Sequence, residues 1–140
     1  LNEAKLAQNP SEIPAGAILI KQNTIIAQAH NESILNNDPT AHAEIQLLRK
    51  AGDQQKNYRL TGSTLYVTLE PCTMCFGAMI HARIERIVFG SFDAKTGVCG
   101  SCINLNEKNF FNHKISITGG ILEKQSSELL RLFFKSKRDK

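Results

Sequence analysis

Two short motifs in this sequence combine residue types that bind zinc. His42 and Glu44 are separated by one residue, and Cys72 and Cys75 form a Cys-x-x-Cys pair. One imidazole and two thiolates are three good zinc ligands, and three protein ligands leave the fourth tetrahedral position open to water. Because structural zinc sites are normally closed by four protein ligands, this set predicts a catalytic metal site.

Glu44 is the candidate proton carrier of this site, since it lies two residues from His42 and is not needed as a ligand. Zinc can lower the pKa of a bound water from about 15.7 to roughly 7, which makes hydroxide available at neutral pH. A carboxylate beside that water can take its proton and return it to a ring nitrogen and then to a departing amine. The chemistry we expect is hydrolytic deamination.

A second Cys-x-x-Cys pair, Cys99 and Cys102, allows other interpretations. The two pairs together could form a four-cysteine zinc ribbon, and Cys99 with Cys102 could also be a redox pair. The stretch between the pairs, residues 76–98, is 23 residues long, whereas roughly 15 to 20 residues are usual in such ribbons. A ribbon would also leave His42 and Glu44 without a role. We therefore expect Cys99 and Cys102 to be small residues of a loop.

The composition is that of an ordinary globular protein. The chain has 140 residues, of which 41% are hydrophobic and 21% charged, and it contains no repeat or low-complexity tract. This excludes a collagen, a coiled coil and a disordered tail, and it predicts one domain over 1–140. No apolar run approaches the ~18 residues of a membrane span. The first ten residues are too polar for a signal peptide, so we expect a cytoplasmic protein with no membrane partner. The chain begins with leucine rather than methionine, which leaves an upstream segment open.

The net charge of +4 is concentrated at the C-terminus, where four of the last six residues are basic and one is acidic. Charge gathered in this way predicts an anionic partner near that end.

The hydrophobic pattern predicts an α/β protein in which helices cover both faces of a mixed five-stranded sheet, a three-layer α/β/α sandwich. We expect strands at 17–20, 24–29, 65–69, 86–89 and 115–118, and helices over 1–8, over 41–52, from 71 and from 122. Asp38 or Thr40 is the expected N-cap of the second helix, and Gly90 is expected to end the fourth strand. Both zinc motifs then fall where chain segments enter helices, and the positive helix ends favour deprotonated sulfur.

Beyond these features, the sequence resembles the bacterial tRNA-specific adenosine deaminases nearly from end to end. The shared motifs are TAHAE at 40–44, LYVTLEPCTMC at 65–75, GAMIH at 77–81, DAKTG at 93–97, NH at 112–113 and FFKSKR at 133–138. The first two carry the H-x-E and P-C-x-x-C signature of the wider zinc deaminases. The last three are typical of the tRNA-acting branch.

The resemblance implies a cytidine deaminase-like fold, a homodimer, and conversion of adenosine to inosine at the wobble position of a tRNA, typically an arginine tRNA. It implies one zinc ion per subunit, held by His42, Cys72 and Cys75, with Glu44 moving protons. It also implies contacts to the tRNA anticodon stem-loop from Asn31, Ala43, Glu70, Pro71, Asp93, Lys95, Asn112, His113, Phe134, Lys137 and Arg138.

Within that set, the resemblance implies that Asn31 hydrogen-bonds the flipped nucleoside, while Ala43 and the 70–71 backbone line the pocket. The residues at 93, 95, 112 and 113 would contact flanking nucleotides, and those at 134, 137 and 138 would lie along the RNA. Each has a simpler alternative: Asn31 could satisfy its own turn, the terminal cations could complement the helix dipole, and Phe134 could belong to the core. An RNA substrate suits the chemistry, because an adenine amine is reachable only after the base has been extruded from its stack.

Two alternative functions remain open at this point. One is a related zinc deaminase acting on a free base or nucleotide, such as guanine, cytosine or deoxycytidylate. The other is a non-catalytic zinc-ribbon module that binds nucleic acid.

Overall fold

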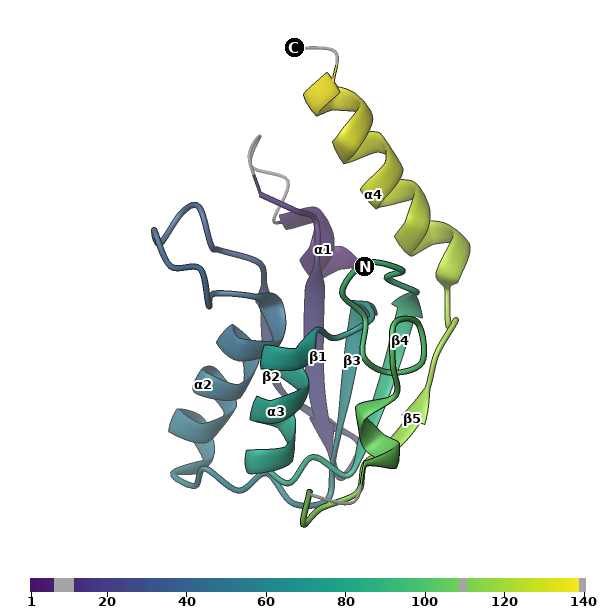
Figure 1. Cartoon of the computed structure of the whole chain (residues 1–140). Helices are drawn as coiled ribbons and strands as arrows, with labels where there is room; N and C mark the ends of the chain where they lie inside the picture. The colour runs from purple at the N-terminus through teal and green to yellow at the C-terminus, as the bar shows by residue number, and fades with distance from the viewer. Residues whose placement is uncertain (7–11, 109–110, 139–140) are drawn as a thin grey trace.

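The computed structural model describes residues 1–6, 12–108 and 111–138 (Figure 1). Its elements, in chain order, are α1 (Asn2–Leu6), β1 (Gly16–Lys21), β2 (Thr24–His30), α2 (Ala43–Gln55), β3 (Ser63–Leu69), α3 (Thr73–His81), β4 (Arg86–Ser91), the 3-10 turn η1 (Leu105–Glu107), β5 (Ser116–Thr118) and α4 (Glu123–Arg138). All five predicted strands and all four predicted helices are present in the expected order. Among the residues that the structure describes, none of the helices has the length and apolar composition needed to cross a membrane.

The strands form one mixed sheet in the order β2-β1-β3-β4-β5. Strand β1 pairs antiparallel with both β2 and β3, whereas β3, β4 and β5 run parallel. The first two strands thus form a hairpin, and the combination of antiparallel and parallel pairs confirms the predicted mixed sheet. Because the parallel strands β3 and β4 end at the same edge of the sheet, the segments that follow them meet there, as expected for a functional site in an α/β protein.

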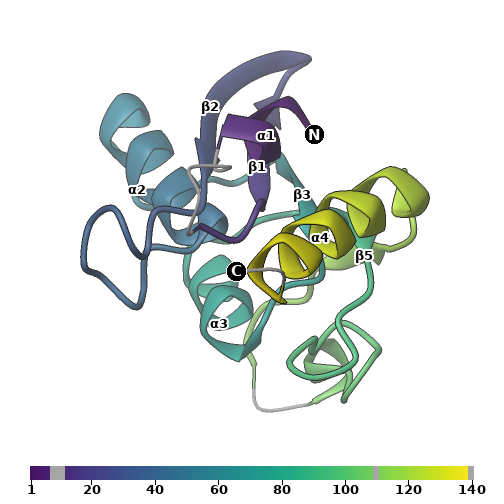
Figure 2. The same ribbon diagram turned by 90° about the horizontal axis from the view of Figure 1, so that it is seen from above.

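Helices lie on both faces of the sheet, which confirms the three-layer sandwich. Figure 2 shows α2 and α3 on one side of the strands and α1 and α4 on the other. The core between the sheet and the α2–α3 layer contains Leu19, Leu47, Leu65 and Phe76, each fully buried. Burying one such side chain contributes about 1.5–3 kcal/mol, so this layer fixes the positions of α2 and α3 firmly.

The start and end of α2 differ from the prediction. The N-cap residue is His42 rather than Asp38 or Thr40, and the helix continues to Gln55, past Gly52. The carboxylate of Asp38 is instead used in its own turn, where Oδ1 accepts hydrogen bonds from the backbone N–H and the hydroxyl of Thr40. His42 therefore stands at the helix end itself, with its imidazole free to face the start of α3.

The prediction that Gly90 ends the fourth strand is also wrong, since β4 continues through Gly90 to Ser91. A Cβ atom at Gly90 would overlap the Ser126 side chain of α4 and would press on the carbonyl oxygen of Thr68. Glycine stands here because α4 crosses the sheet closely, and not because the strand stops.

Candidate metal centre and substrate pocket

Three side chains that could hold a metal ion meet at the N-terminal ends of α2 and α3. His42 is the N-cap residue of α2, Cys72 is the N-cap residue of α3, and Cys75 lies in the first turn of α3. The Nδ1 atom of His42 lies 3.7 Å from the Sγ atom of Cys72 and 3.5 Å from that of Cys75. Residues 30 and 33 positions apart in the sequence are thus within coordination reach of one point.

These distances fit a tetrahedral zinc ion. With Zn–S bonds of about 2.3 Å and Zn–N bonds of about 2.0–2.1 Å, a tetrahedron places nitrogen and sulfur ligands roughly 3.5 Å apart. The ligand atoms of His42, Cys72 and Cys75 all lie within 4.8 Å of one another. Over residues 1–6, 12–108 and 111–138, this is the one group of three potential ligands with such spacing. Three ligands of this type leave the fourth position open, as in a catalytic site.

The cluster favours ionised sulfur at Cys72. A hydrogen bond from Cys75, together with the neighbouring His42 ring, lowers the pKa of the Cys72 thiol to about 4. The same contact raises the pKa of the donor Cys75, and burial raises it further. The contact with Cys72 also raises the pKa of His42. Since the thiolate is the form that binds a metal, one ligand is already ionised at neutral pH, and metal binding would displace the proton that the two sulfurs share.

Glu44 lies beside the cluster in the first turn of α2. The residue is 6% exposed, and it lines the same pocket as His42 and Cys72. Burial away from water raises the pKa of its carboxyl group to about 7. A group whose pKa is near the working pH can both accept and release a proton, which is the property that a general acid–base requires.

A pocket of about 150 Å³ opens over these side chains. Its walls come from the segment before β1, the end of the β2 strand, the start of α2, the turn from β3 into α3, and the segment after β4. The lining residues are Ile13, Ala15, Asn31, His42, Ala43, Glu44, Leu69, Glu70, Cys72, Asp93 and Thr96. Four of the residues that the sequence places near the substrate, at positions 31, 43, 70 and 93, are therefore brought together with the metal cluster. Pro71 is buried next to them, and its carbonyl oxygen accepts a hydrogen bond from Val98.

The sequence left two roles open for Asn31: a contact within its own turn and a contact with the substrate. The structure shows the first and leaves room for the second. Its Nδ2 donates to the carbonyl oxygen of Ile13, and its Oδ1 accepts from the Ser33 hydroxyl, which is a contact within its own turn. A carboxamide can take part in four hydrogen bonds, so capacity for a ligand remains. Its position in the pocket wall is compatible with a substrate contact.

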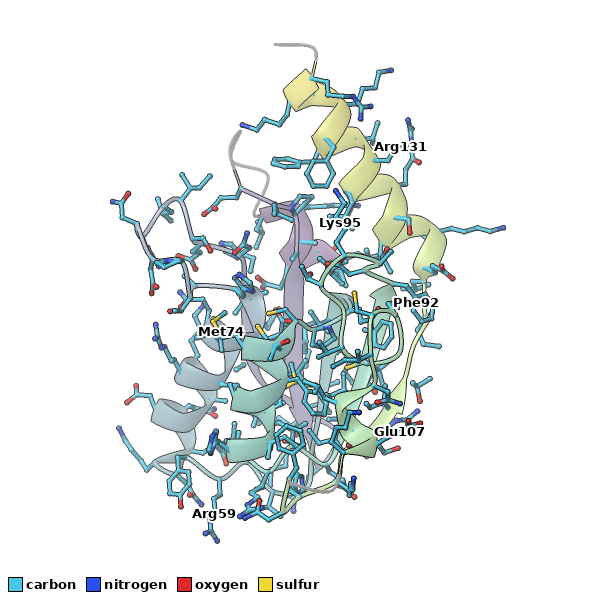
Figure 3. All side chains as sticks on the ribbon, in the orientation of Figure 1. Arg59, Met74, Phe92, Lys95, Glu107 and Arg131 are labelled. Atoms are coloured by element: carbon cyan, nitrogen blue, oxygen red, sulfur yellow. The ribbon has the colours of Figure 1, made fainter. Side chains whose placement is uncertain are left out.

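Asp93 is held in a tight turn at the mouth of the pocket. Its Oδ1 accepts the backbone N–H groups of Lys95 and Thr96, and its Oδ2 accepts the Thr96 hydroxyl at 2.7 Å. Burial alone would raise the pKa of this carboxyl group, but the hydrogen bonds outweigh burial and lower it. The exposed Lys95 borders a neighbouring hollow with Cys72 and Met74, and Figure 3 shows Met74 at the N-terminal end of α3.

Asn112 and His113 lie away from this pocket, near the C-terminal end of α3. The Oδ1 of Asn112 accepts a hydrogen bond from Arg83, and the Nε2 of His113 lies 2.7 Å from the carbonyl oxygen of Ile84. Asn112 borders a separate concavity of about 490 Å³ with Arg59, Arg83 and other residues. Figure 3 places Arg59 at the bottom of the molecule, below Met74, which lies about midway up. The structure therefore does not bring Asn112 and His113 to the metal cluster, and their contact with nucleotides stays a prediction.

The three C-terminal residues of the predicted set lie on α4. Figure 1 shows this helix extending past the end of the sheet, and Ser126 is the residue of α4 that is buried within the described part. Phe134 is 48% exposed, so it does not belong to the core. The ammonium group of Lys137 lies 5.6 Å from the centre of the Phe133 ring, and Arg138 ends the helix.

Cys99 and Cys102 stand apart from the metal cluster, in the segment that follows β4. Cys99 is buried, and burial raises the pKa of its thiol to about 12. Cys102 is exposed, and its thiol contacts the carbonyl oxygen of Ala94. The four-cysteine ribbon is therefore wrong, because the group of described residues that could hold a metal ion consists of His42, Cys72 and Cys75 and includes neither Cys99 nor Cys102.

Sequence reasoning missed Thr96 and Ile13 as pocket residues, along with the hydrogen bonds made by the Glu70 side chain. The DAKTG motif contained a signal for Thr96, since an aspartate followed three residues later by threonine is typical of a closed polar turn. Ile13 and the Glu70 carboxylate offered no local signal, because both depend on contacts between distant segments.

The fold and the metal cluster define a zinc deaminase, and comparison with known proteins agrees. The family model described as "Cytidine and deoxycytidylate deaminase zinc-binding region" matches residues 1–91. A solved guanine deaminase from Nitrosomonas europaea shares the fold, with a TM-score of 0.75 at 22% identity over 94% of this chain and 80% of its own.

Closer relatives identify the branch. The tRNA-specific adenosine deaminase of Buchnera aphidicola subsp. Baizongia pistaciae is 52% identical over 96% of this chain and 83% of its own length. That of Bacillus subtilis is 42% identical over 100% of this chain and 87% of its own. A solved structure from work on A-to-I editing by tRNA:A34 deaminases at the wobble position of transfer RNA has a TM-score of 0.90 at 40% identity, covering 93% of this chain and 94% of its own. The chain belongs to the family of tRNA-specific adenosine deaminases.

Proposed function

We propose that this protein converts adenosine to inosine at the wobble position of a tRNA, with an arginine tRNA as the substrate. The observation that carries the proposal is the placement of His42, Cys72 and Cys75 around one point, beside the buried Glu44 in a pocket. The overall reaction consumes one water and releases one ammonia. Relatives that are named for this activity match the chain over nearly all of its length.

His42, Cys72 and Cys75 would hold one zinc ion per subunit. When bound, zinc supplies a Lewis acid that makes a water molecule nucleophilic near neutral pH. The buried Glu44 carboxylate accepts a proton from the attacking water and delivers it to the ring nitrogen of adenine. It then accepts the proton that remains on the added oxygen and donates it to the exocyclic amine, which leaves as ammonia as the C–N bond breaks and the carbonyl of inosine forms. Burial raises the pKa of the Glu44 carboxyl group above its ordinary value, and this makes the group a better proton donor when it returns the proton.

The pocket walls orient the extruded base. Asn31 would hydrogen-bond the nucleoside with the capacity that its turn contacts leave over, while Ala43 and the backbone of Glu70 and Pro71 would enclose it. Apolar side chains, among them Ile13, Ala15 and Leu69, form part of the pocket wall, and a polar contact beside such groups is stronger than the same contact in water.

The remaining predicted contacts would hold the RNA outside the pocket. Asp93, which lines the pocket, and Lys95, which borders the neighbouring hollow, would contact nucleotides beside the target. Phe134, Lys137 and Arg138 would lie along the RNA. Single-stranded RNA loops are bound in this manner, by stacking and by cationic contacts to phosphate. Asn112 and His113 would contact nucleotides from the far end of α3.

We also infer that the protein is a cytoplasmic homodimer. The outward face of α2 and α3 carries a concavity lined by apolar side chains, including Ile45, Leu48, Ala78 and Ala82. An apolar face of this type suits burial against a second copy of the chain. Light scattering at micromolar concentration should give twice the mass of one chain, and a monomer would contradict the inference.

A substrate competition tests the function. An anticodon stem-loop with adenosine at the wobble position should release ammonia faster, at equal concentration, than guanine, cytosine or deoxycytidylate. Its guanosine-substituted counterpart is the matched control and should release none. A higher rate on any of the free compounds would select the alternative deaminase and contradict the proposal.

A further inference from the structure

The Glu70 side chain is a buried carboxylate with an unusual set of partners. The residue directly follows β3 and is 2% exposed. Its Oε1 accepts the backbone N–H of Asp93 at 3.0 Å and the hydroxyl of Ser101, and its Oε2 accepts the backbone N–H groups of Cys99 and Ser101 at 2.9 and 3.1 Å. All four donors are neutral, and all four belong to the segment 93–101, which we call the wall loop.

Because the four groups of the wall loop donate hydrogen bonds, both oxygens of the residue at position 70 must act as acceptors. An ionised carboxylate accepts at both oxygens, whereas glutamine would present an amino group to two of the donors and break half of the hydrogen bonds. Hydrogen bonds to an ionised acceptor are also stronger than those between neutral groups. The Glu70 carboxylate is thus matched to the wall loop by accepting hydrogen bonds at both of its oxygens.

The wall loop reaches the pocket from its other side. Asp93 and Thr96 line the pocket together with His42 and Glu44. The backbone N–H of Val98 donates to the carbonyl oxygen of Pro71, next to the metal ligand Cys72. Glu70 and Pro71 therefore connect the turn that carries the metal ligand to the loop that closes the pocket.

Gly97 shows how closely the two parts fit. A Cβ atom at Gly97 would overlap the carboxyl group of Glu70 and press on the carbonyl oxygen of Asp93. The backbone angle at Gly97 is not of the left-handed type that favours glycine, so the close approach to Glu70 explains why glycine stands there.

We propose that Glu70 is a positioning residue for RNA recognition: its carboxylate holds the wall loop so that Asp93 and Thr96 face the extruded nucleoside and its neighbours. The inference rests on the proposed function, and it assigns to the side chain of Glu70 a role separate from that of its backbone. Glu70 does not touch the reacting atoms; it acts through Asp93.

The test compares Glu70→Gln with the wild-type enzyme on an adenosine stem-loop. KM should rise at least about fivefold while kcat falls by less than about threefold, since a displaced wall weakens substrate binding and leaves the metal ligands and Glu44 in place. Zinc content should equal that of the wild type. Amide hydrogen exchange at Asp93, Cys99 and Ser101 should become faster.

Ser63→Ala is the matched control, because Ser63 is buried at the opposite end of β3 and its hydroxyl donates to the carbonyl oxygen of Leu60. It should lower the unfolding temperature and leave KM unchanged. Gly97→Ala should repeat the rise in KM by displacing the carboxylate without removing it. In the double variant Glu70→Gln/Asp93→Ala, the rise in KM should be smaller than the product of the single effects.

Three results would overturn the proposal: an unchanged KM in Glu70→Gln, an equal rise in KM in Ser63→Ala, or independent effects in the double variant. Loss of zinc from Glu70→Gln would also overturn it, because Glu70 would then act through Cys72. Inosine formation by the wild type is measured in the same assay, so a failure of the proposed function is seen separately as an inactive wild-type protein.

Discussion

The two ends of helix α3 carry polar groups of very different character. At the N-terminal end, Cys72 and Cys75 meet His42 and Glu44 in a pocket where burial and mutual contacts shift the pKa values of all four groups. At the C-terminal end, Arg83 donates to the exposed Asn112 beside an open concavity. Buried polar groups depend on one another, whereas exposed ones interact mainly with water. Substitutions at the N-terminal end of α3 should therefore reduce activity far more than substitutions at its C-terminal end.

Removal of one metal ligand should have the largest effect. Cys72→Ala should lose zinc, reduce activity below about one-thousandth of the wild-type rate, and lower the unfolding temperature, because metal binding is coupled to folding. Metal analysis and thermal unfolding measure the change. Cys102→Ala is the control, since its exposed thiol is outside the cluster. An active, zinc-free Cys72→Ala protein would contradict the role of Cys72 as a metal ligand that activity requires.

Glu44→Gln should have the next largest effect and should separate chemistry from metal binding. We expect kcat to fall by about 10²–10⁴-fold, the usual contribution of a general acid–base. Zinc content and unfolding temperature should remain close to those of the wild type, because Glu44 is not a ligand. If zinc is lost together with activity, the carboxylate belongs to the metal site and not to proton transfer.

Substitution of the cations on α4 should have a smaller effect, on binding alone. The variant Lys137→Gln/Arg138→Gln should weaken stem-loop binding several-fold and reduce the slope of log K against log salt by about 1 for each phosphate that is no longer neutralised. Filter binding between low and physiological salt measures this slope. A wild-type affinity that does not change with salt would count against an RNA substrate.

The smallest effect is expected at the far end of α3. Asn112→Ala should leave kcat unchanged and raise KM by no more than about threefold, because Asn112 is exposed and lies away from the pocket. Steady-state kinetics on the stem-loop are sufficient. A fall in kcat as large as that of Glu44→Gln would mean that the two ends are not separate in the working enzyme.

Much of the fold and of the metal site can be predicted from the sequence, for physical reasons. The strands have clear β-rich patterns, and His42, Cys72 and Cys75 lie where helices begin, so their convergence follows from the α/β arrangement. The N-cap prediction is wrong because Asp38 and Thr40 have cap chemistry that the chain uses in a turn. Local pattern cannot distinguish these two uses.

The remaining features depend on contacts between distant segments. In the sequence, Gly90 is typical of a strand end. In the fold, β4 continues past it, and glycine is needed because the side chain of Ser126 in α4 lies where a Cβ atom would be. The Glu70 carboxylate meets the wall loop, 23 to 31 residues later in the chain. Likewise, the distance of Asn112 from the pocket depends on the path of the chain after β4, which no motif encodes.

The most direct measurement is to incubate the zinc-loaded protein with total tRNA and to sequence the RNA for A-to-I changes, beside the same preparation of Glu44→Gln. We expect inosine at the wobble position with the wild-type protein and none above background with the variant. Unmodified tRNA after incubation with wild-type protein, or equal inosine with both proteins, would contradict it.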